Sequence, residues 1–271
     1  MRIISLTSIP SRFDGLEALL HSLLRQGADE VRLYIPEQYR RFPEWDGRLP
    51  KVPGGVTICR VDEDFGPATK ILPACRDFRG KDAQILFCDD DCVCADGWAD
   101  RLFWLQRRRK NQAVAVYVRS AEGYVPNKVR RDSMWDLQAW QLPIKYDVPY
   151  RFSRLLSKLF GTETLSRRPF VIPGYGDIFF GVAGVVVRPD FFDEIAFYIP
   201  PEAWPVDDVW LSANLARRKI RIYCPWMAAL PRASALAERD ALVDESFLGL
   251  KRQQLNSAAA QLCQERFKIW F

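Results

Sequence analysis

Three consecutive aspartates, Asp89, Asp90 and Asp91, follow the apolar run of residues 84–88. Such a run is typical of a strand that is buried on both faces of a parallel sheet. Carboxylates crowded at the end of that strand repel one another, and partial burial raises the cost of their charge. A cation is therefore expected to neutralise them, and hard oxygen ligands favour Mg²⁺ or Mn²⁺ held jointly with substrate phosphates. The alternative interpretation is a solvated turn that caps the next helix.

Cys88, Cys92 and Cys94 bracket the three acids. Their spacing lacks the second cysteine pair or nearby histidine of a zinc site, so buried free thiols are expected instead. The chain has seven cysteines, an odd number at irregular spacing, which favours reduced thiols in a cytoplasmic protein. His21 is the only histidine, and it is expected to be a surface or packing residue of the first helix.

The composition is that of a globular chain. Its 271 residues are 48% hydrophobic and 27% charged, which excludes disordered, collagen-like and low-complexity classes. No apolar run approaches the roughly 18–20 residues of a membrane span, and the first residues do not resemble a secretory signal. The formal net charge of +5 is too small to indicate a nucleic-acid partner, and none is expected.

The expected elements alternate between strands and helices. Strands are predicted at residues 2–7, 31–35, 56–61, 84–88, 113–118, 178–187 and 220–224. Helices are predicted at residues 16–24, 97–109, 189–196, 208–217 and 246–263. The first of them is expected to have Asp14 as its N-cap and Gly27 as its C′ residue. A short helix is expected to begin at Pro67 and to be limited or kinked by Pro73. This order predicts an α/β fold with a mostly parallel sheet flanked by helices, whose ligand lies beyond the carboxyl ends of the strands.

The strand with its three aspartates resembles the DxD element of nucleotide-sugar-dependent glycosyltransferases of the GT-A fold, in particular bacterial members like family 2. The resemblance covers about residues 1–230 and implies one Rossmann-like GT-A domain over residues 1–271. It divides the domain into a nucleotide-binding half at 1–120, an irregular insertion or lid at 121–175, and an acceptor half with a C-terminal helix at 176–271. It also makes Asp91 the metal ligand, with Asp89 and Asp90 as its partners at the ribose and the metal's water shell. Asp89 is a second candidate ligand.

Two further segments fall where the resemblance places the donor. The loop after the first strand resembles the nucleoside-binding loop and contains Thr7, Ser8, Ile9, Pro10, Ser11 and Arg12. Its backbone and hydroxyls are suited to a uracil edge, and Arg12 to the phosphates; an ordinary strand-to-helix turn is the alternative. The second segment, Asp64-Phe65-Gly66-Pro67-Ala68-Thr69-Lys70, resembles the D-[FY]-G-P-x-T-K motif of several GT-A families.

The resemblance gives three residues of this second segment a role. Gly66 allows a close approach of backbone and ligand, Phe65 stacks on the base, and Lys70 compensates charge near the diphosphate. The alternative interpretation of the segment is a helix start with a solvated lysine.

Asp207 and Asp208 open a predicted helix and resemble the superfamily's x-E-D motif. The resemblance implies that Asp208, or Asp207 beside it, is the general base that deprotonates the acceptor hydroxyl. Acids at a helix start are also ordinary N-terminal stabilisers. Small and polar residues upstream resemble the stretch that lines the acceptor and donor sugar, although tight strand packing would explain them equally: Gly174, Tyr175, Gly176, Asp177, Gly181, Ala183 and Gly184.

The function implied by the resemblance is metal-assisted transfer of a hexosyl or related sugar from a UDP-sugar to an acceptor hydroxyl on a glycan or lipid-linked molecule, with inversion. One departure is that no C-terminal histidine is present to complete the metal site. A nucleotidyltransferase that makes nucleotide sugars is an alternative, but its Gly-rich loop after the first strand is missing here. A non-catalytic nucleotide- or sugar-binding protein on the same scaffold is a third interpretation.

Residues 151–160 form a short amphipathic pattern inside the irregular segment. Its apolar positions share one face, and its basic positions lie away from that face: Phe152, Leu155, Leu156, Leu159 and Phe160 against Arg151, Arg154 and Lys158. A core-facing helix with a solvated basic side is the simpler interpretation. The alternatives are a lid over the acceptor site, or a peripheral contact with anionic lipid at the inner membrane face.

Overall fold

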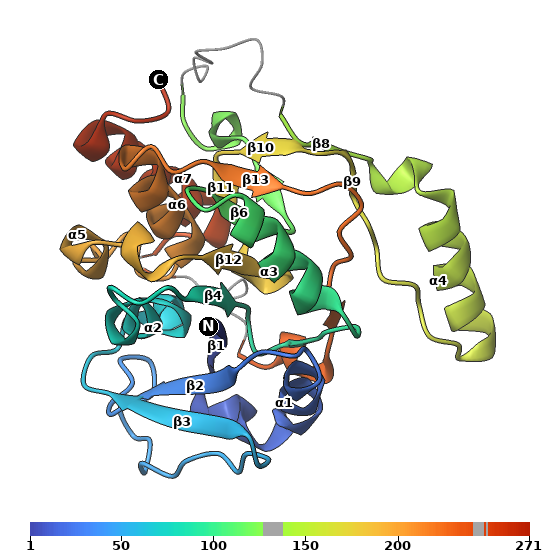
Figure 1. Ribbon diagram of the computed structural model, residues 1–271, viewed down its shortest axis with the longest axis horizontal. Helices are drawn as coiled ribbons and strands as arrows, with labels where there is room; N and C mark the ends of the chain where they lie inside the picture. The colour runs from blue at the N-terminus through green and yellow to red at the C-terminus, as the bar shows by residue number, and fades with distance from the viewer. Residues whose placement is uncertain (127–137, 241–246, 248) are drawn as a thin grey trace.

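An eight-stranded sheet organises the molecule in the computed structural model, which describes residues 1–126, 138–240, 247 and 249–271 (Figure 1). The strand order is β10-β13-β6-β12-β4-β1-β2-β3. The bounds are β1 (Arg2–Thr7), β2 (Glu30–Pro36), β3 (Val56–Val61), β4 (Gln84–Phe87), β6 (Ala113–Ala115), β10 (Gly174–Gly176), β12 (Val185–Val187) and β13 (Ile222–Cys224). β1, β2, β3 and β4 are mutually parallel, as are β6 and β13, whereas β12 and β10 run antiparallel to their neighbours. The predicted mostly parallel α/β sheet is confirmed.

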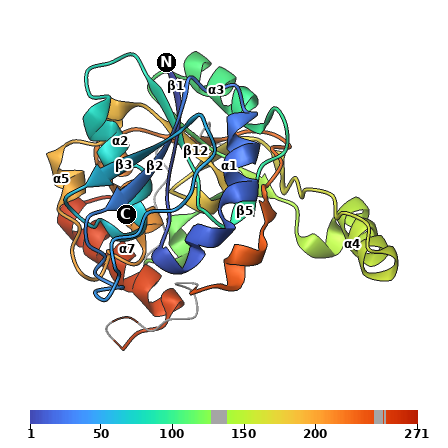
Figure 2. The ribbon, with the colours of Figure 1, turned by 90° about the horizontal axis from the view of Figure 1, so that it is seen from below.

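Side chains alternate between the two faces of the sheet and build a core on each. In β1, Ile3 belongs to one apolar cluster and Ile4 to the other, as the period of two in a strand requires. Helices α1 (Glu17–Leu24) and α3 (Trp98–Arg108) cover one face. Helices α2 (Leu72–Asp77), α5 (Glu194–Phe197), α6 (Asp207–Arg217) and α7 (Arg252–Phe267) cover the other. Figure 2 shows α1 and α3 on the opposite side of the sheet from α2 and α7.

The predicted strand at residues 178–187 is broken into two pieces. β11 (Ile178–Phe179) pairs with β7 (Val118–Arg119) outside the main sheet, and a 3-10 turn over Gly181–Ala183 leads into β12. Gly184 has φ +95° at this break, a backbone conformation that residues with a Cβ rarely adopt. The predicted strand at residues 113–118 is likewise divided between β6 and β7. Both divisions let the chain leave the sheet close to its carboxyl edge.

Three details of the predicted helix ends are wrong. Asp14 does not cap α1, because it lies inside a 3-10 helix at Pro10–Gly15 and Leu16 is the N-cap without a side-chain hydrogen bond. Gly27, with φ +64°, stands two residues beyond the C-cap Arg25 and not at C′. By contrast, the helix that Pro67 opens is short, as predicted: it is a 3-10 helix at Gly66–Lys70 that ends before Pro73, and Pro73 falls in the first turn of the separate helix α2. The last helix begins at Arg252, and most of its predicted start at 246–251 lies outside a helix or outside the described residues.

Shorter elements surround the sheet. β5 (Cys92–Val93) pairs with β14 (Arg232–Ala233), and β8 (Trp140–Gln141) pairs with β9 (Phe170–Ile172). Part of the predicted irregular insertion, residues 127–137, lies outside the described residues. All seven cysteines are described as free thiols, and six of them are buried. Across the described ranges, none of the helices combines the length and apolar character needed to cross a membrane.

Helix α4 (Val148–Phe160) stands away from the rest of the molecule (Figures 1 and 2). The simpler prediction for its sequence, a helix with its apolar side in the core, is wrong. Ser153 is the buried residue of α4, whereas Phe152, Leu155, Leu159 and Phe160 are exposed. The irregular segment therefore presents an apolar surface to the outside.

The break before β12 gives a test of the packing. A Cβ built on Gly184 would lie 2.1 Å from Cζ2 of the buried Trp98 ring. Because a left-handed backbone and an overfilled core both cost free energy, we expect Gly184→Ala to lower the free energy of unfolding by about 2–4 kcal/mol in urea titrations. Gly47→Ala is the control, since Gly47 has φ +80° but nothing within 4 Å of its Cβ position. Equal losses in the two variants would contradict the clash.

Candidate functional site

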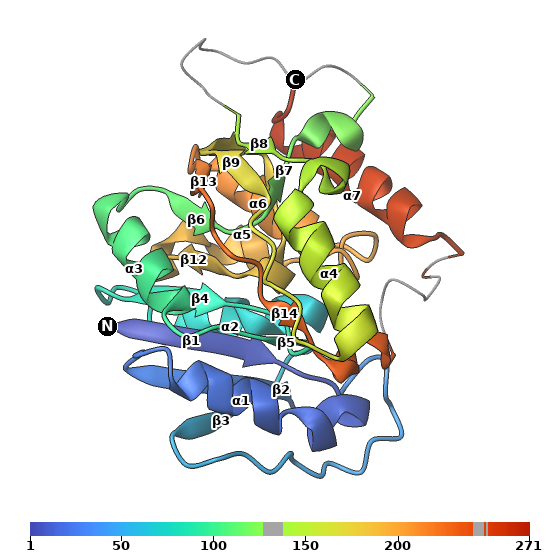
Figure 3. The same ribbon diagram turned by 90° about the vertical axis from the view of Figure 1, so that its right-hand side faces the viewer.

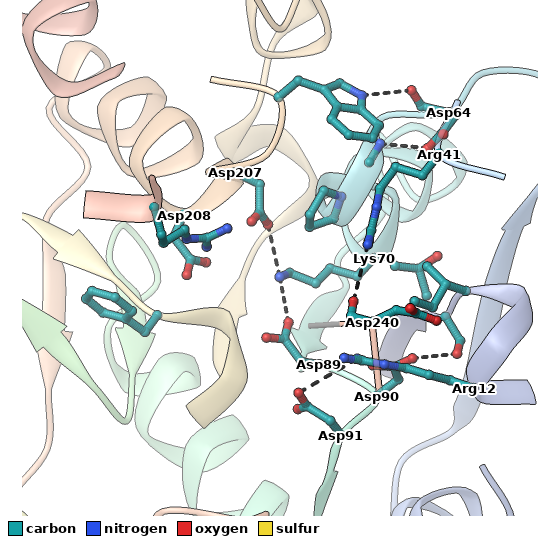
Figure 4. Close-up of a pocket in the computed structure, with 18 of the residues that line it drawn as sticks. Arg12, Arg41, Asp64, Lys70, Asp89, Asp90, Asp91, Asp207, Asp208 and Asp240 are labelled. Atoms are coloured by element: carbon teal, nitrogen blue, oxygen red, sulfur yellow. Dashed lines mark hydrogen bonds and ion pairs between the residues drawn. The ribbon is translucent and has the colours of Figure 1, made fainter. Parts of the chain in front are cut away.

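A cavity of about 410 Å³ lies at the carboxyl ends of β1, β3 and β4, where the loops after the strands meet the start of α6. This is the edge at which open α/β sheets bind ligands. Figure 4 shows the charged side chains that converge there from these separate elements. Twelve of the residues predicted from the sequence line the cavity: Thr7, Ser8, Ile9, Arg12, Asp64, Gly66, Lys70, Asp89, Asp90, Asp91, Asp207 and Asp208.

Asp90 is held by the loop after β1. Arg12 donates from Nη1 to its Oδ1 at 2.5 Å, and the Ser8 hydroxyl donates to its Oδ2 at 2.5 Å. Burial raises the pKa of Asp90, while Arg12 and Ser8 act to lower it. Arg12 also donates from Nε to the carbonyl of Arg239 at 2.8 Å, so its guanidinium is fixed on two sides. Both oxygens of Asp90 are therefore engaged by the protein.

Lys70 joins Asp89 to Asp207. Its Nζ lies 2.7 Å from Oδ1 of Asp89 and 2.9 Å from Oδ2 of Asp207, and its side chain is only 3% exposed. Burial by itself would lower the pKa of Lys70, but Asp207, Asp89 and Asp208 together raise it well above its ordinary value. The lysine is therefore a buried ammonium that links the end of β4 to the start of α6 (Figure 4).

Asp91 is the acid of the triplet that the protein leaves largely unpaired. Its Oδ2 lies 3.7 Å from Nη1 of Arg12, and its buried Oδ1 has no hydrogen-bond partner among the described residues. Burial and the neighbouring Asp89 and Asp90 raise its pKa to about 6. A buried carboxylate oxygen without a donor is costly unless a ligand or cation completes it.

The donor set at Asp91 fits a divalent cation. Carboxylate oxygens are the ligands that Mg²⁺ and Mn²⁺ prefer. Within the described ranges, no group of three His, Cys, Asp or Glu side chains is arranged to hold a metal ion. A cation at Asp91 would therefore take most of its ligands from a bound anion and water, as Mg²⁺ commonly does with phosphates.

Asp208 faces the same cavity from the first turn of α6. The amide of Gly181 donates to its Oδ1 at 2.9 Å. Burial and the adjacent Asp207 raise the pKa of Asp208 to about 7, although Lys70 opposes this. A Cβ on Gly181 would lie 2.7 Å from Nζ of Lys70, so a larger residue there would crowd the ammonium. The arrangement gives a carboxylate that can exchange a proton near neutral pH, which is what a general base requires.

The loop after β3 forms another wall of the cavity. Asp64 accepts hydrogen bonds from the backbone amides of Arg40 and Gly66, both at 2.8 Å, and the Trp204 indole donates to its carbonyl at 3.3 Å. Burial raises the pKa of Asp64. Gly66 has φ +60°, and a Cβ there would lie 2.7 Å from the Trp204 ring. The Asp64 side chain therefore fixes the backbone of this wall, and Gly66 lets that backbone pack against Trp204.

Other predicted site residues lie outside the cavity. Phe65 was expected to stack on a base, but its side chain is 2% exposed and packs edge-on against Phe197 in the core. Pro10 begins a 3-10 helix and does not line the cavity. To stack on a nucleotide base, Phe65 would have to leave the core, so the expected stacking role is wrong.

The predicted acceptor stretch does not line the cavity. Gly174, Tyr175 and Gly176 form the edge strand β10, where a Cβ on Gly176 would lie 2.4 Å from Val118 Cβ. Asp177 accepts a hydrogen bond from the Ala121 amide at 2.8 Å. Ala183 is buried, and Gly184 packs under Trp98. Of this stretch, Gly181 is the residue whose amide contacts a charged group of the site.

Sequence reasoning missed several residues that line the cavity: Tyr39, Arg41, Phe42, Arg119, Tyr124, Phe180, Trp204, Ala237, Asp240, Arg252 and Asn256. The aromatic and basic run at residues 39–45 follows β2 and could have been noticed as a loop at the carboxyl edge. Its Tyr39 hydroxyl donates to the Ser8 carbonyl at 2.6 Å. Arg252 and Asn256 come from α7, and no local pattern in the sequence points to them.

Comparison with known proteins identifies the architecture. No family model matches the sequence, and no curated protein matches it. Among solved structures, GalNAc-T7 with UDP, GalNAc and Mn²⁺ superposes with a TM-score of 0.54 at 10% identity, over 99% of this chain and 49% of that chain. S. aureus TarS 1-349 gives a TM-score of 0.45 at 12% identity, over 98% of this chain and 72% of that chain. At such identities, structural similarity shows the fold alone. The chain has the GT-A fold that its sequence predicts. It spans about half the length of the GalNAc-T7 chain.

Replacing the buried ammonium tests the link between β4 and α6. Lys70→Met leaves Asp89 and Asp207 facing each other without a cation, so we expect the free energy of unfolding to fall by about 3–5 kcal/mol in urea titrations. Adding Asp207→Asn to this variant should restore part of the loss, because one of the two unpaired charges is gone. Lys51→Met, at an exposed lysine, is the control and should change stability by less than about 0.5 kcal/mol. A loss in Lys70→Met no larger than in the control would contradict the link.

The raised pKa of Asp208 predicts a specific pH dependence of stability. Between pH 3.8 and about 7 the folded chain holds a proton that an unfolded aspartate has released, so this group makes stability fall as pH rises. Asp208→Asn removes the titration but keeps an oxygen for the Gly181 amide. The melting temperature of the variant minus that of the wild type should therefore increase from about pH 4 to about pH 8. Asp62→Asn, an exposed control, should give a flat difference; a flat difference for Asp208→Asn as well would contradict the assignment.

Proposed function

We propose that this chain is a glycosyltransferase that moves a sugar from a nucleotide-diphosphate donor to an acceptor hydroxyl. The observation that carries the proposal is the division of labour among three adjacent acids. Asp89 and Asp90 are paired with Lys70 and Arg12, whereas Asp91 keeps a buried oxygen without a partner beside a cavity of about 410 Å³. A GT-A fold with this arrangement at the end of β4 suits a pyrophosphate bound through a cation.

A UDP-sugar is the donor that we favour. The GalNAc-T7 structure was solved with UDP and Mn²⁺, and the loops at Ser8 and Asp64 of this chain line the cavity where a nucleoside would lie. Asp91, with Asp89 beside it, would hold Mn²⁺ or Mg²⁺, which when bound neutralises the negative charge that develops on the departing diphosphate. That the cavity belongs to a nucleotide-binding half within residues 1–120 is part of this proposal.

Lys70 and Arg12 support the donor site indirectly. Each is buried and held by carboxylates, so neither is free to move fully onto a phosphate. Their positive charge still lies within the acidic cluster and keeps the anionic wall from repelling a diphosphate. We propose that they stabilise the folded acidic site first, and compensate substrate charge through that position.

Asp208 is the general base in this proposal. The Gly181 amide fixes one of its oxygens, and a pKa of about 7 allows it to accept a proton from an acceptor hydroxyl and release it to water. Asp207 is tied to Lys70 and instead keeps the first turn of α6 in place. A base that activates the acceptor directly favours inversion at the anomeric carbon.

The acceptor is proposed to be a glycan or a lipid-linked molecule, and the transferred group a hexose or a related sugar. The free thiols support activity in the cytoplasm, where disulfides are rare. Residues 121–175 would act as the insertion or lid and residues 176–271 as the acceptor half.

Two substitutions separate donor binding from transfer. With Asp91→Asn, we expect UDP together with Mn²⁺ to lose its stabilising shift in a thermal melt, because the unpaired oxygen would no longer carry charge. Asp208→Asn should keep that shift but lower the rate of sugar transfer or donor hydrolysis by about 10²–10⁴-fold. Asp62→Asn, an exposed carboxylate outside the cavity, is the matched control for both measurements.

The same assays discriminate the alternatives. Formation of a nucleotide sugar and pyrophosphate from UTP and a sugar 1-phosphate would indicate a nucleotidyltransferase. A thermal shift by UDP without any donor turnover, with acceptors and Mn²⁺ present, would indicate a binding protein. A wild-type chain that shows no shift with any nucleoside diphosphate and metal would remove the proposed function.

A further inference from the structure

Helix α4 is a well-formed helix that depends little on packing against the core. The Asp147 side chain accepts a hydrogen bond from the Tyr150 amide at its start. At its end the Gly161 amide donates to the Ser157 carbonyl at 2.9 Å, with Gly161 at φ +66°. Such caps satisfy backbone groups at both ends of a helix. Its 13 residues span about 20 Å.

The helix is attached through its polar side. Ser153 is its buried residue, and the Ser153 hydroxyl accepts from the Leu165 amide and donates to the Tyr150 carbonyl. The returning segment is fixed by Arg167, whose Nε donates to Asp147 at 3.3 Å. The attachment therefore uses hydrogen bonds and an ion pair, and it leaves the opposite side of the helix uncovered.

An apolar stripe runs along that uncovered side. Its members stand at i, i+4, i+7 and i+11, the spacing of a single helix face, and are 67%, 59%, 51% and 65% exposed: Val148, Phe152, Leu155 and Leu159. At 100° per residue, the centre of this stripe lies more than 90° around the helix from Ser153. Figures 1 and 2 show α4 projecting from the body of the molecule, and in Figure 3 it lies toward the viewer. With the exposure of its members, this makes the stripe part of the outer surface.

Basic residues border the stripe on one side. Arg151, Arg154 and Lys158 are exposed and follow the i, i+3, i+7 spacing, and α4 contains no acidic residue. The acids that flank α4 in the sequence are neutralised within the protein, because Asp147 pairs with Arg167 and Glu163 pairs with Arg232. The surface around the stripe is therefore positive.

We propose that α4 docks the protein onto an anionic membrane surface, lying in the plane of the interface with its apolar stripe in the lipid and its basic row at the headgroups. A helix with an apolar face and a Lys/Arg-rich border is the kind that binds such surfaces, through buried apolar area and attraction to anionic lipid together. The proposal concerns the outer surface of the chain and stands whether or not the cavity transfers a sugar.

A second copy of the chain is the other partner that could cover the apolar stripe. Stripe-to-stripe packing of two copies would bring two basic rows together, with no acid on α4 to pair with them. Four side chains on a helix of about 20 Å also cover much less than the about 800 Å² per partner of a stable interface. Both charge and area therefore favour the anionic bilayer.

The test is flotation of the full chain, without nucleotide, with vesicles of phosphatidylcholine alone or of equal parts phosphatidylcholine and phosphatidylglycerol. We expect the wild type to float with the anionic vesicles in low salt, to float weakly with the neutral ones, and to be released by high salt. Leu155→Glu with Leu159→Glu should weaken binding by at least about 100-fold, because two carboxylates enter the lipid-facing stripe. Arg154→Gln with Lys158→Gln should weaken it by about 25-fold on anionic vesicles, which is about fivefold per charge.

Matched variants keep the test interpretable. Ile195→Glu with Tyr198→Glu adds the same two charges at positions 41% and 72% exposed in and beside α5, and should float like the wild type. Asp208→Asn should also float like the wild type, so that failure of docking and failure of the proposed chemistry can be told apart. All four positions changed on α4 are exposed, so the melting temperatures of these variants should match that of the wild type.

Three results would overturn the proposal. One is wild-type protein that stays at the bottom of the gradient with anionic vesicles in low salt. Another is a Leu155→Glu, Leu159→Glu variant that floats as well as the wild type. The third is a wild-type dimer in sedimentation equilibrium that the same variant converts to monomer, because a second copy would then cover the stripe.

Discussion

Mutual repulsion of carboxylates around one cavity is the constraint on which the site depends. Seven aspartates line the cavity with five basic side chains, and two of those cations, Lys70 and Arg12, are almost fully buried. Lys70 holds Asp89 against Asp207, and Arg12 holds Asp90, so the end of β4, the loop after β1 and the start of α6 are fixed by ion pairs. Breaking such a pair leaves a buried charge, which costs far more than the pair gains over neutral packing. The acids and their cations are therefore one structural unit.

The carboxylates of the cavity are not all neutralised by the protein, and this suits the binding of a charged ligand. If every carboxylate were paired with a cation of the protein, the cavity would have no unpaired carboxylate left to bind a charged ligand. Among the three consecutive aspartates Asp91 is the exception, with a buried oxygen that lacks a donor among the described residues and a pKa of about 6. Asp208 is a second group poised near neutrality, because its neighbours and burial act against its charge. Perturbed acids of this kind in a cleft are typical of functional sites.

The sequence predicts the sheet, the acidic triplet and the position of the site because these follow from local patterns. The apolar run before Asp89 indicates a buried strand, and strand ends of a parallel sheet meet at one edge. The contacts of Lys70 and Arg12 could not be predicted, because their partners lie at distant positions in the chain. The role of Phe65 was mispredicted for a related reason. An aromatic side chain in such a motif can stack on a nucleotide base or pack in the core, and here it packs against Phe197, which lies far along the chain. The break at Gly184 depends on the Trp98 ring and is also a long-range effect.

The hydrogen bond from Arg12 to the Arg239 carbonyl has a consequence for the architecture of the polypeptide. The Arg12 guanidinium donates to the Arg239 carbonyl while it neutralises Asp90, so two segments 227 residues apart in the sequence meet at the lining of the cavity. The position of the Asp90 carboxylate therefore depends on the segment around residue 239, so a change in that segment, far from β4 in the sequence, would alter the acidic cluster.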